Sequence, residues 1–312
     1  MELLDAARVR DLIDPCALVE ALRDAFAHPD ATTVPERGHY RIDEDLGATL
    51  LVMPAWTKGD LIGVKVVGHY PRNSERGLPA INGSYLLADA TTGVPVAVLD
   101  GTELTRLRTA AASALAADYL APPRIGEHLL IGAGNVNAAI PVMYAAVRQV
   151  AMTRVWARKP EQAMALVERL RADGFQAQVA GNLREAVRRA DVITAATSAT
   201  SPLVLGADVR PGTHVDLIGA FSASMIEADE ELITSASLFI DVPAALHEPG
   251  DLVGPLERGT LTEEDVKATL ADLAAGRHTG RSTAEEVTVF KSVGSSLEDL
   301  VAARLAWSAR SS

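Results

Sequence analysis

The most informative segment of the chain is Leu129-Leu130-Ile131-Gly132-Ala133-Gly134-Asn135-Val136-Asn137. It has the pattern of a short apolar strand, a Gly-x-Gly turn and the start of a helix. Gly132 permits the tight turn, Gly134 lets the backbone approach a pyrophosphate, and the following helix offers unpaired amide groups to the anion. Asn137 replaces the usual third small residue, whose packing role could pass to Ala138. The segment predicts a dinucleotide-binding turn, and the alternative is an ordinary strand–helix turn.

Around this segment, short apolar runs alternate with helix-like segments from about residue 127 onward. The expected strands are 128–131, 153–157, 176–179, 192–196, 214–219 and 238–241, and the expected helices are 138–149, 161–173 and 183–190. Strands that alternate with helices pair in parallel and carry helices on both faces of the sheet. We therefore expect an α/β fold with a Rossmann-type, doubly wound parallel sheet.

The first 120 residues have a different pattern. Asp14-Pro15 predicts the start of a helix with apolar positions at Leu18, Leu22 and Phe26. Strand-like runs separated by turn residues then predict a mostly antiparallel sheet. An alanine-rich segment, 105–120, predicts a long buried helix, and 296–308 predicts a closing amphipathic helix. The expected strands of this part are 48–54, 61–68, 81–88 and 94–99.

Composition excludes several classes of function. The chain has 312 residues, 48% of them hydrophobic, and a net charge of −12, so we expect neither nucleic acid nor an anionic membrane as a partner. Cys16 is the single cysteine and no HExxH-like spacing occurs, so we expect no disulfide framework and no metal site. The sequence starts without a signal-peptide pattern and contains no apolar run of roughly 18 residues, which favours a cytoplasmic protein.

Two cations follow the strand after the glycine turn, in Val155-Trp156-Ala157-Arg158-Lys159. A site that prefers NAD often has an acidic residue near this position for the ribose hydroxyls, and Ala157 stands there instead. We expect Arg158 and Lys159 to bind an adenosine 2′-phosphate, which makes NADPH the expected cofactor and NADH the alternative. A solvated basic loop is the other interpretation.

Three further cations lie beside apolar strands or in the alanine-rich helix. Lys65 lies inside Leu61-Ile62-Gly63-Val64-Lys65-Val66-Val67, where a lysine needs a carboxylate partner or a polar cleft. Arg108 lies in the alanine-rich helix, and Arg37 precedes a strand. Together they could hold a small carboxylate, with an arginine fork binding in a bidentate manner. Each of them alone could be part of a structural ion pair.

Taken together, these motifs resemble the ornithine cyclodeaminase/mu-crystallin family of NAD(P)-dependent proteins. The resemblance extends from about residue 34 to residue 305 and is most specific at Arg108-Thr109-Ala110-Ala111 and Phe290-Lys291-Ser292-Val293-Gly294. It implies a homodimer and two domains. Residues 1–120 and 293–312 would form an α+β domain for substrate binding and dimerisation, and residues 121–292 the Rossmann domain.

The resemblance also implies roles for individual residues. The carboxylate of the substrate would be bound by Arg37, Lys65 and Arg108, with Arg41 as a substitute for Arg37, and Lys65 and Arg108 would be catalytic. Phe221 and Val293 would lie beside the substrate. In addition to Gly132, Gly134, Arg158 and Lys159 from the motifs above, the contacts of the cofactor would be made by Asn82, Thr109, Asn135, Val136, Thr197, Gly219, Ala220 and Ser292.

One departure from the family pattern favours a particular reaction. The cyclodeaminases carry an aspartate that handles the amine of the substrate, and Phe221 takes its place in Gly219-Ala220-Phe221-Ser222. A phenyl ring cannot exchange a proton, so the expected activity is NADPH-dependent reduction of a cyclic imino acid, such as Δ1-pyrroline-2-carboxylate or Δ1-piperideine-2-carboxylate. The alternatives are an L-amino acid dehydrogenase or reductase of an open-chain imine such as iminosuccinate, an ornithine cyclodeaminase, and an NADPH-dependent binder of a small ligand.

Overall fold

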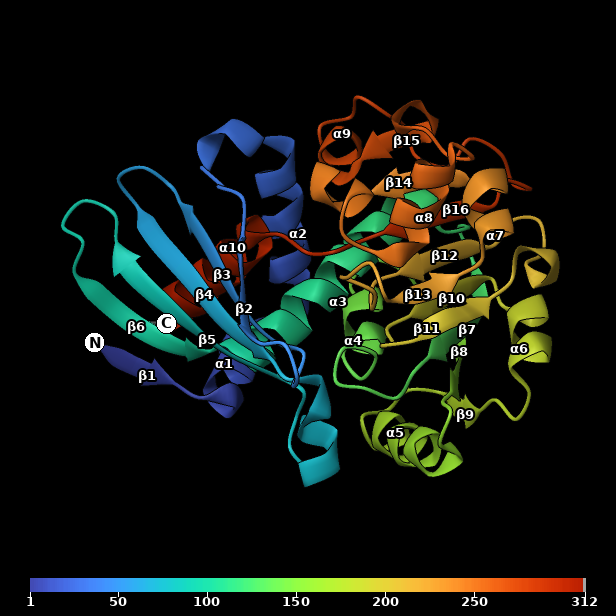
Figure 1. Cartoon of the computed structure of the whole chain (residues 1–312), viewed down its shortest axis with the longest axis horizontal. Helices are drawn as coiled ribbons and strands as arrows, with labels where there is room; N and C mark the ends of the chain where they lie inside the picture. Colours follow the sequence, from blue (N-terminus) through green and yellow to red (C-terminus); the bar gives the residue numbers. More distant parts are fainter. Residues whose placement is uncertain (311–312) are drawn as a thin grey trace. The chain divides into compact units, whose positions relative to one another are not determined.

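The computed structural model describes residues 1–310 and divides the chain into two compact units (Figure 1). Unit 1 consists of Met1–Arg108 and Ser295–Ser312, and unit 2 of Thr109–Gly294. The sequence places the domain boundaries after residues 120 and 292, whereas the division by contacts falls after residues 108 and 294. Ser311 and Ser312, which end the second segment of the predicted substrate domain, lie outside the described residues.

Unit 1 contains a six-stranded sheet in the order β1-β6-β5-β4-β3-β2. All neighbours are antiparallel except β1 and β6, so the expectation of a mostly antiparallel sheet is confirmed. The two edge strands escape the sequence analysis because one is very short and the other is polar and exposed. The strands are β1 (Glu2–Leu4), β2 (Gly38–Asp43), β3 (Ala48–Trp56), β4 (Leu61–His69), β5 (Ile81–Asp89) and β6 (Pro95–Asp100).

The helices of unit 1, and α3, whose residues up to Arg108 belong to unit 1 and the rest to unit 2, include two that begin at clear capping signals. The side chain of Asp14 accepts a hydrogen bond of 2.8 Å from the amide of Ala17 and caps α2, as the sequence predicts. The alanine-rich helix, α3 (Gly101–Leu120), begins earlier than predicted because Asp100 accepts from the amide of Glu103 at 2.7 Å. The other helices are α1 (Ala6–Leu12), α2 (Pro15–Ala27) and α10 (Ser296–Ala309), with 3₁₀ turns η1 (Pro29–Ala31) and η2 (Pro71–Arg76).

The prediction of an amphipathic helix at the chain end is wrong. Helix α10 packs against α1, α2, β3 and β4, and residues 296–303 are all buried. Two of these buried residues are Glu298 and Asp299, which therefore need cationic partners inside unit 1.

Unit 2 contains an eight-stranded sheet in the order β15-β14-β16-β12-β10-β7-β8-β9, in which all pairs are parallel. The expected doubly wound parallel sheet is confirmed. The strands are β7 (Ile125–Ile131), β8 (Val150–Trp156), β9 (Ala177–Val179), β10 (Val192–Ala195), β12 (His214–Leu217), β14 (Ser237–Ile240), β15 (Val266–Thr269) and β16 (Thr288–Lys291), with a separate pair β11 (Thr200–Val204) and β13 (Ile226–Ala228).

The helix after the glycine turn is much shorter than the predicted 138–149. Helix α4 covers only Ile140–Tyr144. Pro141 lacks an amide hydrogen and fits only the first turn of a helix, so the helix starts at Ile140, and the chain after Tyr144 continues in turns. The other helices of unit 2 are α5 (Pro160–Ala172), α6 (Leu183–Arg189), α7 (Glu230–Ser235), α8 (Gly250–Arg258) and α9 (Leu270–Ala274), with 3₁₀ turns η3 (Gly206–Asp208), η4 (Pro243–Leu246) and η5 (Glu263–Asp265).

The two faces of the parallel sheet differ in chemistry. One face is apolar and includes Leu129, Ile193 and Val215. On the other face, Asp216 accepts hydrogen bonds from Ser113 at 2.5 Å and from Tyr144, and thereby ties α3 and α4 to β12. None of the helices in residues 1–310 combines the length and the apolar composition that crossing a bilayer requires.

Candidate active site

The Gly132 turn follows β7 directly, and the side chain of Asn137 fixes its conformation. Gly132 has φ +99°, and a Cβ there would lie 2.8 Å from the carbonyl oxygen of Ala196, so only glycine fits. The buried side chain of Asn137 donates hydrogen bonds of 2.8 Å to the carbonyl oxygens of Ile131 and Gly132. The residue at the third position of the motif thus holds the turn in place through its side chain.

The same turn is open where a dinucleotide needs room. Apart from Gly134 itself and its two neighbours in the chain, no heavy atom of the described residues lies within 4 Å of a Cβ built on Gly134, and Asn135 is exposed. The amide of Gly132 donates to the carbonyl oxygen of Trp156 at 2.8 Å, which joins the turn to the end of β8. Arg158 and Lys159 follow β8 and are exposed. The residues present therefore fit a pyrophosphate at the turn and an adenosine ribose beside β8.

A single buried carboxylate joins the loops that follow β10 and β12. Oε1 of Glu227 accepts from the amide of Thr197 at 2.8 Å and from its hydroxyl at 2.9 Å. Oε2 accepts from the amides of Gly219 at 2.8 Å and Ala220 at 3.1 Å. A Cβ on Gly219 would lie 2.1 Å from the nitrogen of Thr197, so the two loops approach as closely as backbones can. Phe221 follows them and is half-buried.

Glu227 is held by buried partners from other elements. Nζ of Lys291 lies 2.9 Å from Oδ2 of Asp251 and 3.8 Å from Oε2 of Glu227. Oδ1 of Asp251 accepts from the amide of Glu227 at 2.7 Å. Burial raises the pKa of the Glu227 carboxyl, although the Lys291 charge opposes this shift. Glu227 and Asp251 were not among the predicted site residues. The signal that could have found them is Lys291, a lysine in an apolar run, which needs acidic partners.

Ser292 and Val293 are fixed by Asp241. Oδ2 of Asp241 accepts from the hydroxyl of Ser292 at 2.8 Å, from the amide of Val293 at 2.9 Å and from that of Gly294 at 2.7 Å. One carboxylate thus orders the chain directly after β16.

In unit 1, Lys65 and Arg108 meet at the carboxylates of α10. Nζ of Lys65 lies 2.8 Å from Oδ1 and 2.7 Å from Oδ2 of Asp299. Nε of Arg108 donates to Oδ1 of Asp299 at 2.9 Å, and Nη1 donates to Oε2 of Glu298 at 2.8 Å. Lys65 is 2% exposed and Arg108 is 5% exposed, so all four charges are removed from water. We call Lys65, Arg108, Glu298 and Asp299 the charge cluster.

The electrostatics of the charge cluster bring the pKa of Lys65 close to neutral pH. Burial and the Arg108 charge lower the pKa of Lys65 to about 8, against the opposing effect of Asp299 and Glu298. Burial opposes ionisation of Asp299, but Lys65 and Arg108 outweigh it and lower the pKa of this carboxyl. An amine with a pKa near 8 can both hold and release a proton at physiological pH.

Two other predicted cations lie elsewhere in unit 1. Arg37 is half-buried, one residue before β2, and burial together with the Arg37 charge lowers the pKa of His39. Arg41 forms an exposed ion pair of 2.7 Å with Glu44, so it does not join the charge cluster. Thr109 follows Arg108 on α3 and is buried.

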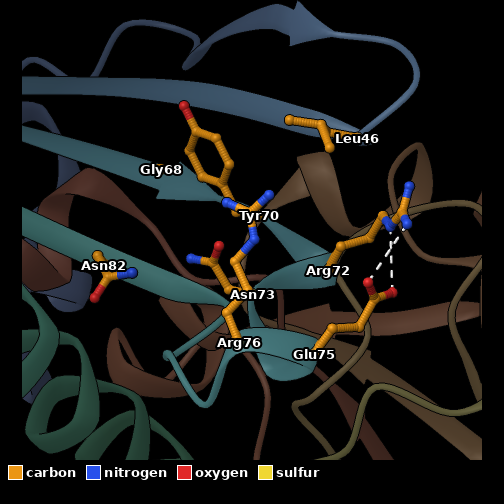
Figure 2. A pocket seen from close by; sticks show the side chains of 8 residues that line it. All are labelled: Leu46, Gly68, Tyr70, Arg72, Asn73, Glu75, Arg76 and Asn82. Atoms are coloured by element: carbon orange, nitrogen blue, oxygen red, sulfur yellow. Dashed lines mark hydrogen bonds and ion pairs between the residues drawn. The ribbon is translucent and has the colours of Figure 1, made fainter.

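Asn82 lies in a pocket of about 350 Å³ at the ends of β4 and β5 (Figure 2). Its side chain donates to the carbonyl oxygen of Pro79 at 3.0 Å. Figure 2 shows Arg72 and Glu75 joined as an ion pair on the rim, with Nε and Oε1 3.2 Å apart. The residues lining the pocket are Leu46, Gly68, Tyr70, Arg72, Asn73, Glu75, Arg76 and Asn82.

The whole chain has the sequence pattern of one known family. The model of the ornithine cyclodeaminase/mu-crystallin family matches residues 2–311. This chain belongs to the ornithine cyclodeaminase/mu-crystallin family. The resemblance seen in the sequence motifs is therefore confirmed, and the family membership covers both units. A fold with a Rossmann-type sheet and a second unit is consistent with this assignment.

Proteins similar in sequence include a reductase. An uncharacterized protein of Schizosaccharomyces pombe is 42% identical over 304 residues, which are 93% of this chain and 92% of that protein. The Δ1-pyrroline-2-carboxylate reductase of Paracoccus denitrificans is 40% identical over 292 residues, which are 91% of this chain and 89% of that enzyme.

Solved structures of similar proteins have the same fold. The Thermococcus litoralis Δ1-pyrroline-2-carboxylate reductase in complex with NADH and L-proline has a TM-score of 0.94 at 32% identity, covering 99% of this chain and 97% of its own. An archaeal alanine dehydrogenase dimer with bound NAD has a TM-score of 0.91 at 28% identity, covering 99% and 95%. The iminosuccinate reductase of Paracoccus denitrificans in complex with NAD⁺ has a TM-score of 0.89 at 28% identity, covering 100% and 96%.

Proposed function

We propose that this protein is an NAD(P)H-dependent reductase of cyclic imino acids, converting Δ1-pyrroline-2-carboxylate or Δ1-piperideine-2-carboxylate to L-proline or L-pipecolate. The observation that carries the proposal is the buried pair Lys65 and Arg108, which offers an ammonium and a guanidinium group from one unit. Such a pair suits a substrate that carries a carboxylate and a basic nitrogen. Relatives named Δ1-pyrroline-2-carboxylate reductase support this choice of substrate.

Unit 2 is assigned the cofactor. The open Gly132 turn would hold the pyrophosphate through the backbone at Gly134, Asn135 and Val136, and the fit rests on the free space at Gly134. When bound, the reduced nicotinamide supplies the hydride for the C=N bond. The remaining assigned contacts are Asn82 and Thr109, Arg158 and Lys159 at the adenosine side, and Thr197, Gly219, Ala220 and Ser292 at the nicotinamide side.

Unit 1 is assigned the substrate. Asp299 and Glu298 occupy Nε and Nη1 of Arg108, so Nη2 is the part of the guanidinium that these carboxylates leave for the carboxylate of the substrate. Arg37 is the second assigned carboxylate ligand. Lys65 holds a proton at Nζ and passes it to the imine nitrogen, while the C=N carbon accepts the hydride. The product gains one C–H and one N–H bond, and Lys65 recovers its proton from water.

Phe221 and Val293 are assigned to the apolar side of the substrate. Phe221 follows Ala220 in the loop after β12, and its phenyl ring has no group that can accept a proton from an amine. This position therefore favours imine reduction over the cyclodeaminase reaction.

The identity of the cofactor can be tested at Arg158 and Lys159. We expect the double variant Arg158→Ala/Lys159→Ala to raise the KM for NADPH by about 10-fold or more, because charge-assisted hydrogen bonds to a phosphate are lost. The KM for NADH should hardly change. Lys267→Ala, another exposed lysine of unit 2, is the matched control. An equal change of the KM for NADPH and for NADH would show that the two cations do not bind the 2′-phosphate.

We also propose that the protein is a homodimer formed through the outer face of the six-stranded sheet. Helix α10 packs on the face that contains Lys65, and α1 and α2 pack against α10. On the opposite face the register aligns Val64 with Leu86. The apolar residues Leu3, Trp56, Val66 and Leu86 are 77%, 36%, 41% and 40% exposed. A continuous apolar face of this kind favours association with a second copy, and one structural relative is an alanine dehydrogenase dimer.

The dimer can be tested by placing charges on this face. We expect Val66→Glu/Leu86→Glu to be a monomer in size-exclusion chromatography with light scattering, because carboxylates do not desolvate in an apolar interface. Met164→Glu, which places a charge at an exposed apolar position on α5, should remain dimeric. A double variant that is folded by circular dichroism and still dimeric would exclude this face as the interface.

We propose that the protein is cytoplasmic, because a protein that uses NAD(P)H and has a single, exposed free cysteine suits a reducing compartment. Fractionation of cells that express a tagged chain would test this assignment.

A second enzymatic function has support of its own. The iminosuccinate reductase and the alanine dehydrogenase among the structural relatives favour an open-chain substrate. The deciding experiment measures oxidation of NADPH and NADH with three kinds of substrate: five- and six-membered cyclic ketimine acids, 2-oxo acids plus ammonia, and iminosuccinate. A separate assay measures the release of ammonia from ornithine. We expect the highest kcat/KM for a cyclic ketimine acid. A higher value for an open-chain substrate, or turnover of ornithine alone, would overturn the proposal.

A further inference from the structure

We propose that Asp299 is a positioning residue of the imine-reducing site, and that its carboxylate holds the ammonium group of Lys65 and the guanidinium group of Arg108 together in the geometry that the reaction needs. The inference rests on the proposed function of Lys65 and Arg108. It assigns to α10 a role in the chemistry that the sequence motifs of the chain did not indicate.

The geometry singles out Asp299 among the acidic residues of unit 1. Lys65 comes from β4, Arg108 from α3 and Asp299 from α10, and all bonds between them are 2.7 to 2.9 Å long. Asp299 bonds to both cations, whereas Glu298 bonds to Arg108. The carboxylate of Asp299 on α10 therefore fixes the positions of two cations that come from two other elements.

The position of Asp299 in its helix also favours a negative charge. Asp299 lies in the first turn of α10, where backbone amides and the helix dipole stabilise a carboxylate. Ser295, the capping residue, accepts from the amide of Leu297 at 3.2 Å. The Ser292–Gly294 segment just before it is ordered by Asp241. The carboxylate is therefore fixed before any ligand binds.

Charge balance gives Asp299 a second effect. Lys65 and Arg108 repel each other, and burial penalises both charges. The groups that face Lys65 are Asp299 and Glu298 from α10, Arg108 and the Thr105 hydroxyl from α3 (3.4 Å), and Tyr85 from β5, whose pKa is raised well above 10 by burial and by the Asp299 charge. Asp299 is the nearest negative charge in this set. Without it, Lys65 loses its proton at a lower pH.

The sign of the pH effect follows directly. Lys65 donates a proton, so the rate falls as the pH rises through its pKa of about 8. Asp299→Asn removes the main group that raises this pKa, so the alkaline limb of the kcat profile should shift to lower pH. We expect kcat at the optimum to fall by about 10- to 100-fold, because an orienting partner of the general acid is lost.

The experiment uses two independent readouts on the full-length protein. The first is the pH profile of kcat with Δ1-pyrroline-2-carboxylate. The second is a ¹³C NMR titration of the protein labelled at lysine Cε, which needs no activity; the chain has only five lysines. Lys65→Met assigns the signal of Lys65. We expect a midpoint near 8 in the wild type and a lower midpoint in Asp299→Asn.

The matched control is Glu103→Gln. Glu103 is also buried in unit 1 and pairs with Arg106 at 2.6 Å and Arg10 at 2.9 Å, but it does not bond to Lys65. It should change neither the titration nor the alkaline limb. If Asp299→Asn does not fold, Asp299→Glu carries the test: the longer side chain displaces one of the two cations, so we expect kcat to fall by about 10-fold and the Lys65 midpoint to move.

The outcomes separate this inference from the proposed function. A wild type that reduces imines, with a folded Asp299→Asn whose kcat, alkaline limb and Lys65 midpoint are unchanged, would overturn the role of Asp299 and leave the proposed function intact. A wild type that reduces no imine would overturn the proposed function. In that case the NMR titration still decides: an unchanged Lys65 midpoint contradicts the inference, and a lowered one supports the coupling.

Discussion

Replacing Lys65 with methionine should lower the kcat for imine reduction by about 100- to 10,000-fold, the range expected when a general acid is removed. Methionine has nearly the length of lysine and fits an apolar strand, but it has no proton to give to the imine nitrogen. Lys65 contacts Asp299 at 2.7 Å, and Arg108 remains to balance that carboxylate, so the variant should still fold. Steady-state oxidation of NADPH and thermal melting followed by circular dichroism measure the two effects.

Lys65→Arg is the informative companion variant. It keeps the positive charge beside Asp299, but a guanidinium group does not release its proton near neutral pH. We therefore expect it to be more stable than Lys65→Met and almost as inactive. A folded Lys65→Met protein that keeps a near-normal kcat would show that the proton comes from elsewhere.

Replacing Arg108 with lysine should lower kcat/KM by about 100-fold or more, mainly through a higher KM for the imino acid. An ammonium group cannot bond to Asp299, Glu298 and a substrate carboxylate at once in the geometry that the planar guanidinium allows. Glu298 also loses its 2.8 Å partner inside the protein, so the melting temperature should fall.

Arg106→Lys is the control for Arg108. Arg106 lies on the same helix, is 8% exposed and pairs with Glu103. Its replacement should lower stability without raising the KM for the substrate. If Arg106→Lys and Arg108→Lys affect KM equally, the effect is a general disturbance of α3 and not the loss of a carboxylate ligand.

The parts of the fold that local patterns determine could be predicted from the sequence. The parallel sheet of unit 2 follows from apolar runs that alternate with helices, and the start of α2 follows from Asp14 and Pro15. The helix after the Gly132 turn was predicted too long, because helical periodicity continues past Tyr144, whereas the backbone after Tyr144 continues in turns. Strand β16 escaped detection because it is four residues long and ends in a lysine.

The partners of the candidate site could not be predicted in the same way. Lys65 was singled out because a lysine in an apolar strand requires compensation, but its partner Asp299 lies 234 residues away in the sequence. Glu298 and Asp299 had the pattern of ordinary acidic residues in the first turn of an amphipathic helix. Only the packing of α10 against β3, β4 and α2 shows that they are buried. The local sequence shows that Lys65 needs an acidic partner, but only the tertiary structure shows that this partner is Asp299.

The most direct test of the account is to follow one hydrogen atom. The protein is incubated with Δ1-pyrroline-2-carboxylate and reduced cofactor that carries deuterium at both hydrogens of nicotinamide C4, and the product is analysed by mass spectrometry and NMR. The account predicts L-proline with one deuterium at C2 and a matching loss of reduced cofactor. Oxidation of the cofactor without deuterated L-proline, or no reaction with any cyclic imino acid, would contradict it.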